Sequence, residues 1–94
     1  MLTYTAAYRF MDDGVHGEVL DFPGAITCGS DLAEARRLLA GALVDLAETY
    51  LVGGEPLPAP QPIVMDPEAD LEEPIHASGL ERLPFQAATT RISS

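Results

Sequence analysis

The fold of this chain is decided by residues 15–54, which read VHGEVLDFPGAITCGSDLAEARRLLAGALVDLAETYLVGG. Alternation over 15–20 predicts a short strand. The run Asp21-Phe22-Pro23-Gly24 predicts a turn, because Pro23 removes a ladder donor and Gly24 tolerates tight geometry. A third short strand over 25–28 and one long amphipathic helix follow. This order predicts a small sheet covered by one helix, a binding scaffold with few places for a catalytic site.

The helix is marked at both ends. Asp31 is the expected N-cap, and Glu34 stands three residues later, as in a capping box. Gly53 and Gly54 end the helix in an αL cap. Gly41 costs about 1 kcal/mol in mid-helix, which predicts close packing at that position. One apolar stripe at three- and four-residue steps faces the sheet: Leu32, Ala35, Leu38, Leu39, Ala42, Leu43, Leu46 and Tyr50.

The N-terminal residues complete the sheet. Residues 2–10 alternate as a strand, with Leu2, Tyr4, Ala6, Tyr8 and Phe10 on one face. The turn Met11-Asp12-Asp13-Gly14 joins this strand to the next. The prediction is an α+β protein: a three-stranded antiparallel meander, one long helix, and a fourth strand after the helix.

Composition changes sharply after the helix. Five prolines between 55 and 67 exclude a helix there. Residues 66–73 are acidic and are predicted to be mobile. Alternation over 83–92 favours a strand, which Pro84 would confine to a sheet edge or a strand start. The predicted organisation is therefore a core over 1–54, a proline-rich and acidic linker over 55–82, and a strand and tail over 83–94.

The charge of the chain restricts its partners. Fifteen acidic residues face five arginines and no lysine, a formal charge of −10 in 94 residues. Such a surface repels nucleic acid and attracts a basic protein, although acidity alone also keeps a small protein soluble. The five tail acids are the candidate contacts: Asp66, Glu68, Asp70, Glu72 and Glu73. Uncovered sheet edges also predict a homodimer or a higher oligomer.

Cysteine usage and hydropathy indicate the compartment. The single Cys28 excludes an internal disulfide and suits a reducing environment. No leader opens the chain, and no apolar run approaches about 18 residues, so a cytoplasmic protein with no membrane contact is expected.

Three groups of residues are candidates for catalytic or metal sites. Asp12, Glu18 and Asp21 could bind Mg²⁺ in a small nuclease, but acids at turns are better explained by turn chemistry. His16 could pair with Glu18 as a base, and Cys28 lies close enough to the helix start to be reactive. A solvent-facing histidine and a buried cysteine are the favoured readings. We therefore expect no catalytic residue, no cofactor and no metal.

The sequence resembles the HicB-like antitoxins over roughly residues 2–60. The matching features are Tyr4-Thr5-Ala6, Asp12-Asp13-Gly14, Asp21-Phe22-Pro23-Gly24, Thr27, Gly29, Asp31-Leu32-x-Glu34-Ala35, Gly53-Gly54, Pro56 and Pro58. The resemblance implies a β-β-β-α-β, partial RNase H-like fold, and a role in covering the active site of a small basic mRNA-cleaving toxin.

Two departures narrow what the resemblance implies. The DNA-binding module that usually follows in such antitoxins is not recognisable in the proline-rich, acidic tail. The carboxylate set of RNase H is not recognisable either, so nuclease activity is not implied. The expected function is that of an antitoxin-like, non-enzymatic protein that occludes a HicA-like toxin or another basic protein. An orphan domain without a toxin is the alternative, beside the small nuclease.

Overall fold

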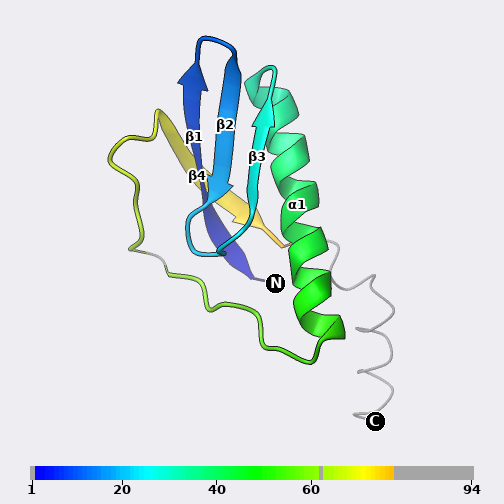
Figure 1. Ribbon diagram of the computed structural model, residues 1–94. Helices are drawn as coiled ribbons and strands as arrows, with labels where there is room; N and C mark the ends of the chain where they lie inside the picture. The colour runs from blue at the N-terminus through cyan, green and yellow to red at the C-terminus, as the bar shows by residue number, and fades with distance from the viewer. Residues whose placement is uncertain (1, 62, 78–94) are drawn as a thin grey trace.

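The computed structural model describes residues 2–61 and 63–77, which form one antiparallel sheet and one helix (Figure 1). The elements in chain order are β1 (Thr3–Met11), β2 (Gly14–Val19), β3 (Ile26–Gly29), α1 (Leu32–Val52) and β4 (Leu71–His76). The strands lie in the order β3-β2-β1-β4. The predicted α+β class and its β-β-β-α-β order are confirmed.

The core lies between one face of the sheet and α1. Tyr4, Ala6 and Tyr8 of β1 are buried there, as their alternation predicts, and they pack with Leu39 and Leu43 of α1. The ends of the predicted face differ from its centre, because Leu2 is 36% and Phe10 53% exposed. The apolar face of β1 therefore extends beyond the part that the core covers.

The Asp21–Gly24 turn contributes to the core through its aromatic residue. Phe22 is fully buried, and its ring meets Tyr4 at 5.2 Å and Tyr50 at 5.4 Å between centroids, both edge to face. Such aromatic pairs stabilise beyond the area they bury. The turn therefore joins the start of β1 to the end of α1.

Both caps of α1 follow the sequence. Asp31 Oδ1 accepts the Glu34 N–H at 2.8 Å, and Glu34 Oε1 accepts the Ser30 N–H at 2.7 Å. The helix ends in a Schellman motif, with Gly54 at φ +76° and the Glu55 N–H donating to the Tyr50 carbonyl. Within the described residues, no helix is both long and apolar enough to cross a membrane.

The helix packs most closely at Gly29 and not at Gly41. A Cβ on Gly29 would lie 2.6 Å from the Ala35 backbone nitrogen, whereas a Cβ on Gly41 meets nothing within 4 Å. The expectation of close packing at Gly41 is wrong, because that residue lies on the exposed side of α1. Because Gly29 of β3 has no side chain, the first turn of α1 can pack closely against the backbone there.

A fourth strand is found at Leu71–His76, inside the segment predicted to be a linker. The strand predicted over 83–92 lies outside the described residues. Residues 71–73, expected to be mobile, pair with β1 in the register Tyr8↔Leu71 to Ala6↔Glu73. Pro74 fits because its partner Thr5 directs its own N–H and C=O toward Asp21 and Leu20, on the β2 side. The ladder between β1 and β4 therefore needs no donor at Pro74.

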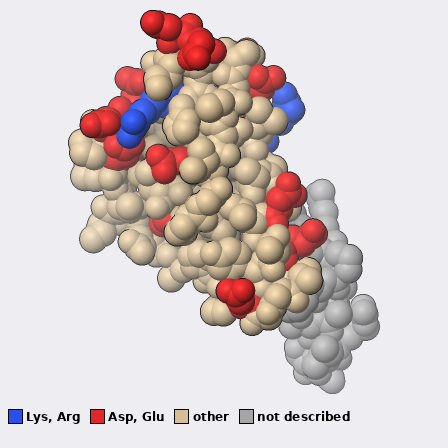
Figure 2. Space-filling model, viewed as in Figure 1, with Lys and Arg blue, Asp and Glu red and all other residues tan. Residues whose placement is uncertain are grey.

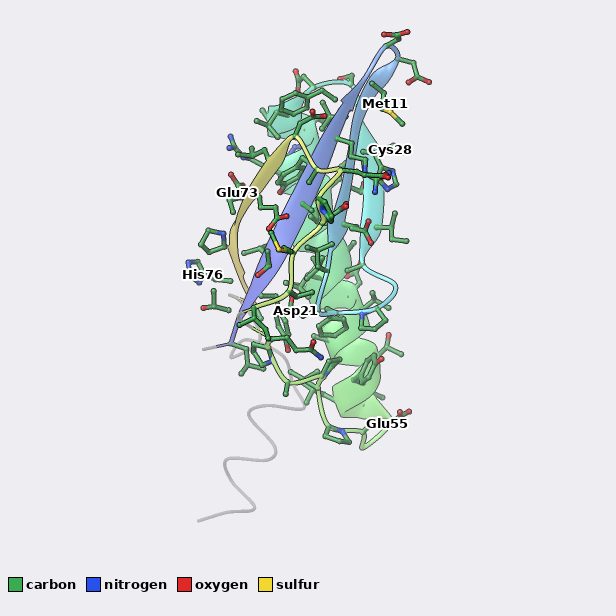
Figure 3. All side chains as sticks on the ribbon, turned by 90° about the vertical axis from the view of Figure 1, so that its left-hand side faces the viewer. Met11, Asp21, Cys28, Glu55, Glu73 and His76 are labelled. Atoms are coloured by element: carbon green, nitrogen blue, oxygen red, sulfur yellow. The ribbon has the colours of Figure 1, made fainter. Side chains whose placement is uncertain are left out.

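A connection that we call the strap, residues 55–61 and 63–70, joins α1 to β4 along the face of the sheet opposite the helix. Figure 1 shows it on the side of the sheet away from α1, and Figure 3, viewed from that side, shows it passing in front of the sheet. Ala7, on that opposite face, is only 3% exposed. The strap thus closes part of a sheet face that would otherwise meet solvent.

Candidate functional site

Asp66 and Glu68, two of the five acids predicted to bind a partner, surround Arg9 of β1. Asp66 Oδ2 lies 3.0 Å from Arg9 Nη2, and Glu68 Oε1 lies 3.4 Å from Arg9 Nη1. The Asp66 side chain is 14% exposed and that of Glu68 76%. The Arg9 hydrogen bond, followed by the Glu68 N–H, lowers the pKa of Asp66 below its ordinary value. Asp66 therefore holds the strap against β1 through Arg9, whereas the Glu68 side chain remains largely in solvent.

The other three acids are also engaged inside the molecule. Asp70 Oδ2 accepts the Phe10 N–H at 2.7 Å, and Glu72 Oε2 accepts the Asp66 N–H at 2.8 Å. Glu73 receives two hydrogen bonds from Arg36 of α1, at 2.7 and 2.9 Å. These contacts bind the strap and β4 to the rest of the fold. A role of the five acids toward a partner stays a prediction.

Asp21 is buried and fastens the strap from the other side. It is 6% exposed, and its two carboxylate oxygens accept the N–H groups of Thr5 and Gln61, each at 2.9 Å. Nearby, the Tyr4 hydroxyl donates to the Pro58 carbonyl at 2.8 Å. Burial, and secondarily the charge of Asp21, raises the pKa of Tyr4. The acid of the Asp-Phe-Pro-Gly turn therefore has a structural role.

The two hydrogen bonds that Asp21 accepts from Thr5 and Gln61 form what we call the Asp21 clamp. A hollow of about 470 Å³ lies beside this clamp, between the strap, β1 and β4. Its walls include Thr3, Pro60 and Pro74, and its carboxylates are Asp21, Glu72 and Glu73. All three carboxylates already accept hydrogen bonds from the protein. Each carboxylate of this hollow therefore already has a donor within the fold.

The structure separates the acids that the nuclease alternative would need in one site. Asp12 lies in the β1–β2 turn, while Asp21 bonds to Thr5 near the opposite end of β1. At about 3.3 Å per residue, seven residues of strand separate those two ends by about 23 Å. No group of three or more potential ligands able to hold a metal ion occurs within residues 2–61 and 63–77. Asp12, Glu18 and Asp21 are therefore not brought together.

His16 and Cys28 are adjacent on paired strands. Their register places them opposite one another, and His16 Nδ1 lies 3.5 Å from Cys28 Sγ. The expectation that Cys28 is buried is wrong: it points to the face of β3 that α1 does not cover, and it is exposed. His16 therefore contacts the thiol of Cys28 on the neighbouring strand. The pairing considered from the sequence was instead with Glu18, two residues further along the same strand as His16.

The end of the β1–β2 hairpin combines exposed apolar and acidic side chains. Phe10 is 53% and Met11 56% exposed, immediately before Asp12 and Asp13. Figure 3 shows Met11 just below the carboxylates of the turn. The sequence pattern treated Phe10 as core and Met11 as turn. One sequence feature could have indicated this exposed surface: two large apolar residues directly precede two acids at the end of a strand.

Comparison with known proteins gives a similarity of fold. No family model matches this chain, and no curated protein matches it. Among solved structures, a chain of the "HicA3 and HicB3 toxin-antitoxin complex" matches with a TM-score of 0.63 and 20% sequence identity. The match covers 80% of this chain and 96% of that chain. This chain therefore shares its fold with a component of a toxin–antitoxin complex.

Proposed function

We propose that this protein is an antitoxin-like interaction protein that binds a small basic RNase toxin of the HicA type and blocks its active site. The observation that carries the proposal is the fold likeness to a chain of the HicA3 and HicB3 complex, extending over 96% of that chain. The HicB-like sequence features in residues 2–60 support the antitoxin as the member of the pair that this chain resembles.

Charge supports the same direction. A formal charge of −10 favours encounter with a basic protein and opposes direct contact with nucleic acid. The proposed mechanism is occlusion without catalysis, in the cytoplasm, where an mRNA-cleaving partner would act. Electrostatic steering accelerates association, and contact with the toxin then denies RNA access to its basic cleft.

Co-expression tests this function. A small basic open reading frame beside the gene, or a HicA-like toxin in its place, is induced in a bacterial host with and without this protein. We expect growth arrest with the toxin alone, rescue by this protein, and co-purification of the two. Persistent arrest with no co-purified toxin would contradict the proposal and favour the orphan domain.

A calorimetric titration separates the enzymatic alternative. The scattered positions of Asp12, Glu18 and Asp21 predict no heat of binding with Mg²⁺ or Mn²⁺. Stoichiometric metal binding together with RNA cleavage by the purified protein would replace the antitoxin proposal with a nuclease.

A further inference from the structure

The carboxylates of the described residues fall into two groups by their surroundings. Arg9, Arg36 and Arg37 each form an ion pair with at least one nearby acid. On the face seen in Figure 2, the arginine side chains (blue) lie beside acidic side chains (red). Within the described residues, Asp12 and Asp13 form no ion pair with any of these arginines. The negative charge at the hairpin end is therefore not balanced locally.

The same end of the molecule is hollowed and partly apolar. A hollow of about 560 Å³ lies between the hairpin end and the start of α1, with Phe10, Met11, Asp12, Asp13, Asp31 and Leu32 in its walls. A second hollow of about 210 Å³ shares Met11 and Asp13 and reaches Cys28. Phe10 and Met11 follow one another in β1, so their side chains lie on opposite faces of the hairpin, and both residues line the first hollow. Exposed aromatic and methionine side chains are typical of interaction surfaces.

The hairpin end is also held in place. The Phe10 N–H donates to Asp70 Oδ2 at 2.7 Å, so the strap fixes β1 at this point. A side chain at Gly14, whose φ is +150°, would meet the Gly29 carbonyl oxygen, so β2 and β3 approach closely here. A surface that is already ordered loses little conformational freedom when a partner binds.

We propose that this hairpin end, residues 10–13 with Asp31 and Leu32, is the docking surface for a basic protein segment. Phe10 and Met11, one on each face of the hairpin, contact apolar parts of that segment. Asp12 and Asp13 meet its arginine or lysine side chains, and Asp31, which also caps α1 through Oδ1, adds a third negative charge. The inference rests on the proposed function and names the surface that the toxin would contact. It replaces the tail acids as the first contact, because four of those five acids accept hydrogen bonds within the fold, whereas Asp12 and Asp13 form no ion pair with the described arginines.

Charge complementarity selects this occupant over a second copy of the chain. Two copies meeting at this end would bring Asp12 and Asp13 of each against the same residues of the other, and like charges in contact oppose association. A basic segment would instead find three carboxylates beside two apolar side chains. Nucleic acid would face the same repulsion as a second copy.

Two double variants test the surface separately for shape and for charge. Phe10→Ser with Met11→Ser removes the apolar part, and Asp12→Asn with Asp13→Asn removes the charge while keeping turn-forming residues. The matched control is Val52→Ser with Ile63→Ser, since these side chains are 70% and 91% exposed elsewhere. Circular dichroism verifies folding, and the charge variant keeps the test valid if the apolar variant does not fold.

Affinity for a catalytically inactive HicA-like toxin is measured by calorimetry at several salt concentrations. We expect each hairpin-end variant to weaken binding by about tenfold or more, and the control to stay within about twofold of the unmodified protein. The charge variant should also flatten the salt dependence. Equal binding of all variants would overturn the docking surface while leaving the antitoxin proposal intact.

A second probe decides the surface if the toxin does not bind at all, a result that contradicts the proposed function alone. A helical peptide with alternating arginine and leucine faces is titrated into the labelled full chain. Amide shifts concentrated at residues 10–14 and 30–32 support the docking surface, and shifts elsewhere or none overturn it. A dimer that is lost in the Phe10→Ser, Met11→Ser variant would also overturn it, because a second copy would then be the occupant.

Discussion

Gly29 shows how one missing side chain permits the helix–sheet contact. A Cβ there would lie 2.6 Å from the nitrogen and 3.0 Å from the Cα of Ala35, both backbone atoms that cannot move aside independently. We expect Gly29→Ala to lower the free energy of unfolding by about 3 kcal/mol. Gly41→Ala, with open space around its Cβ, should raise it by about 0.5–1 kcal/mol. Urea unfolding of both variants checks this, and equal effects of the two substitutions would contradict it.

Asp21 acts at the same scale through its two acceptor oxygens. Asp21→Asn replaces one acceptor with an amide donor, so either the Thr5 or the Gln61 N–H faces another donor. We expect a loss of about 2 kcal/mol in unfolding free energy and faster amide exchange at Thr5 and Gln61. Asp45→Asn, which removes the same charge from an exposed site, should have little effect. Unchanged exchange at both amides would show that the clamp is unimportant.

At the scale of elements, the attachment of the strap to β1 depends on pH. The pKa of Asp66 is lowered in the folded protein, chiefly by the Arg9 hydrogen bond. The resulting stabilisation is complete above the ordinary carboxyl pKa and disappears as the pH falls through the lowered value. The stability difference between the unmodified protein and Asp66→Asn should therefore be constant near neutrality and vanish once the pH has fallen below the lowered pKa of Asp66.

Thermal unfolding across that range checks the pH dependence. Glu68→Gln serves as the control, because an ion pair whose acid is 76% exposed contributes little. A difference for Asp66→Asn that persists unchanged at low pH would mean that its carboxylate does not act through Arg9.

Helix and strands differ in how far the sequence predicted them. The first three strands and α1 were predicted within one or two residues, because caps, turns and periodic apolar positions lie next to one another in the chain. The strand at Leu71–His76 was not predicted, because this segment contains two glutamates and a proline. It is held by distant partners: the β1 ladder and the pair of Arg36 with Glu73.

The candidate surface was harder to predict for the same reason. Acidity identified the tail acids, but no local pattern places Asp66 against Arg9, nearly 60 residues away in the sequence. Likewise, the alternation of β1 places Phe10 on the core face without indicating where α1 begins in space. Which carboxylates and apolar groups remain exposed follows only from tertiary contacts.

At the scale of the whole molecule, two features have opposite effects on self-association. The exposed strand edges predict a homodimer, whereas a formal charge of −10 opposes self-association. If edges dominate, sedimentation at micromolar concentration shows a dimer that strengthens as added salt screens the charge. A monomer at every salt concentration would reject the dimer and leave both edges for other partners.

The pairing of β1 with β4 has a consequence for how the chain emerges from the ribosome. β1 is made first, yet its neighbour on that side lies beyond the helix and the strap, with Thr3 opposite His76. During synthesis, one side of β1 therefore stays unpaired until nearly the whole described chain has been translated, and such a nascent edge is prone to aggregate. A chaperone, or a toxin translated nearby, would find that edge open only in this interval.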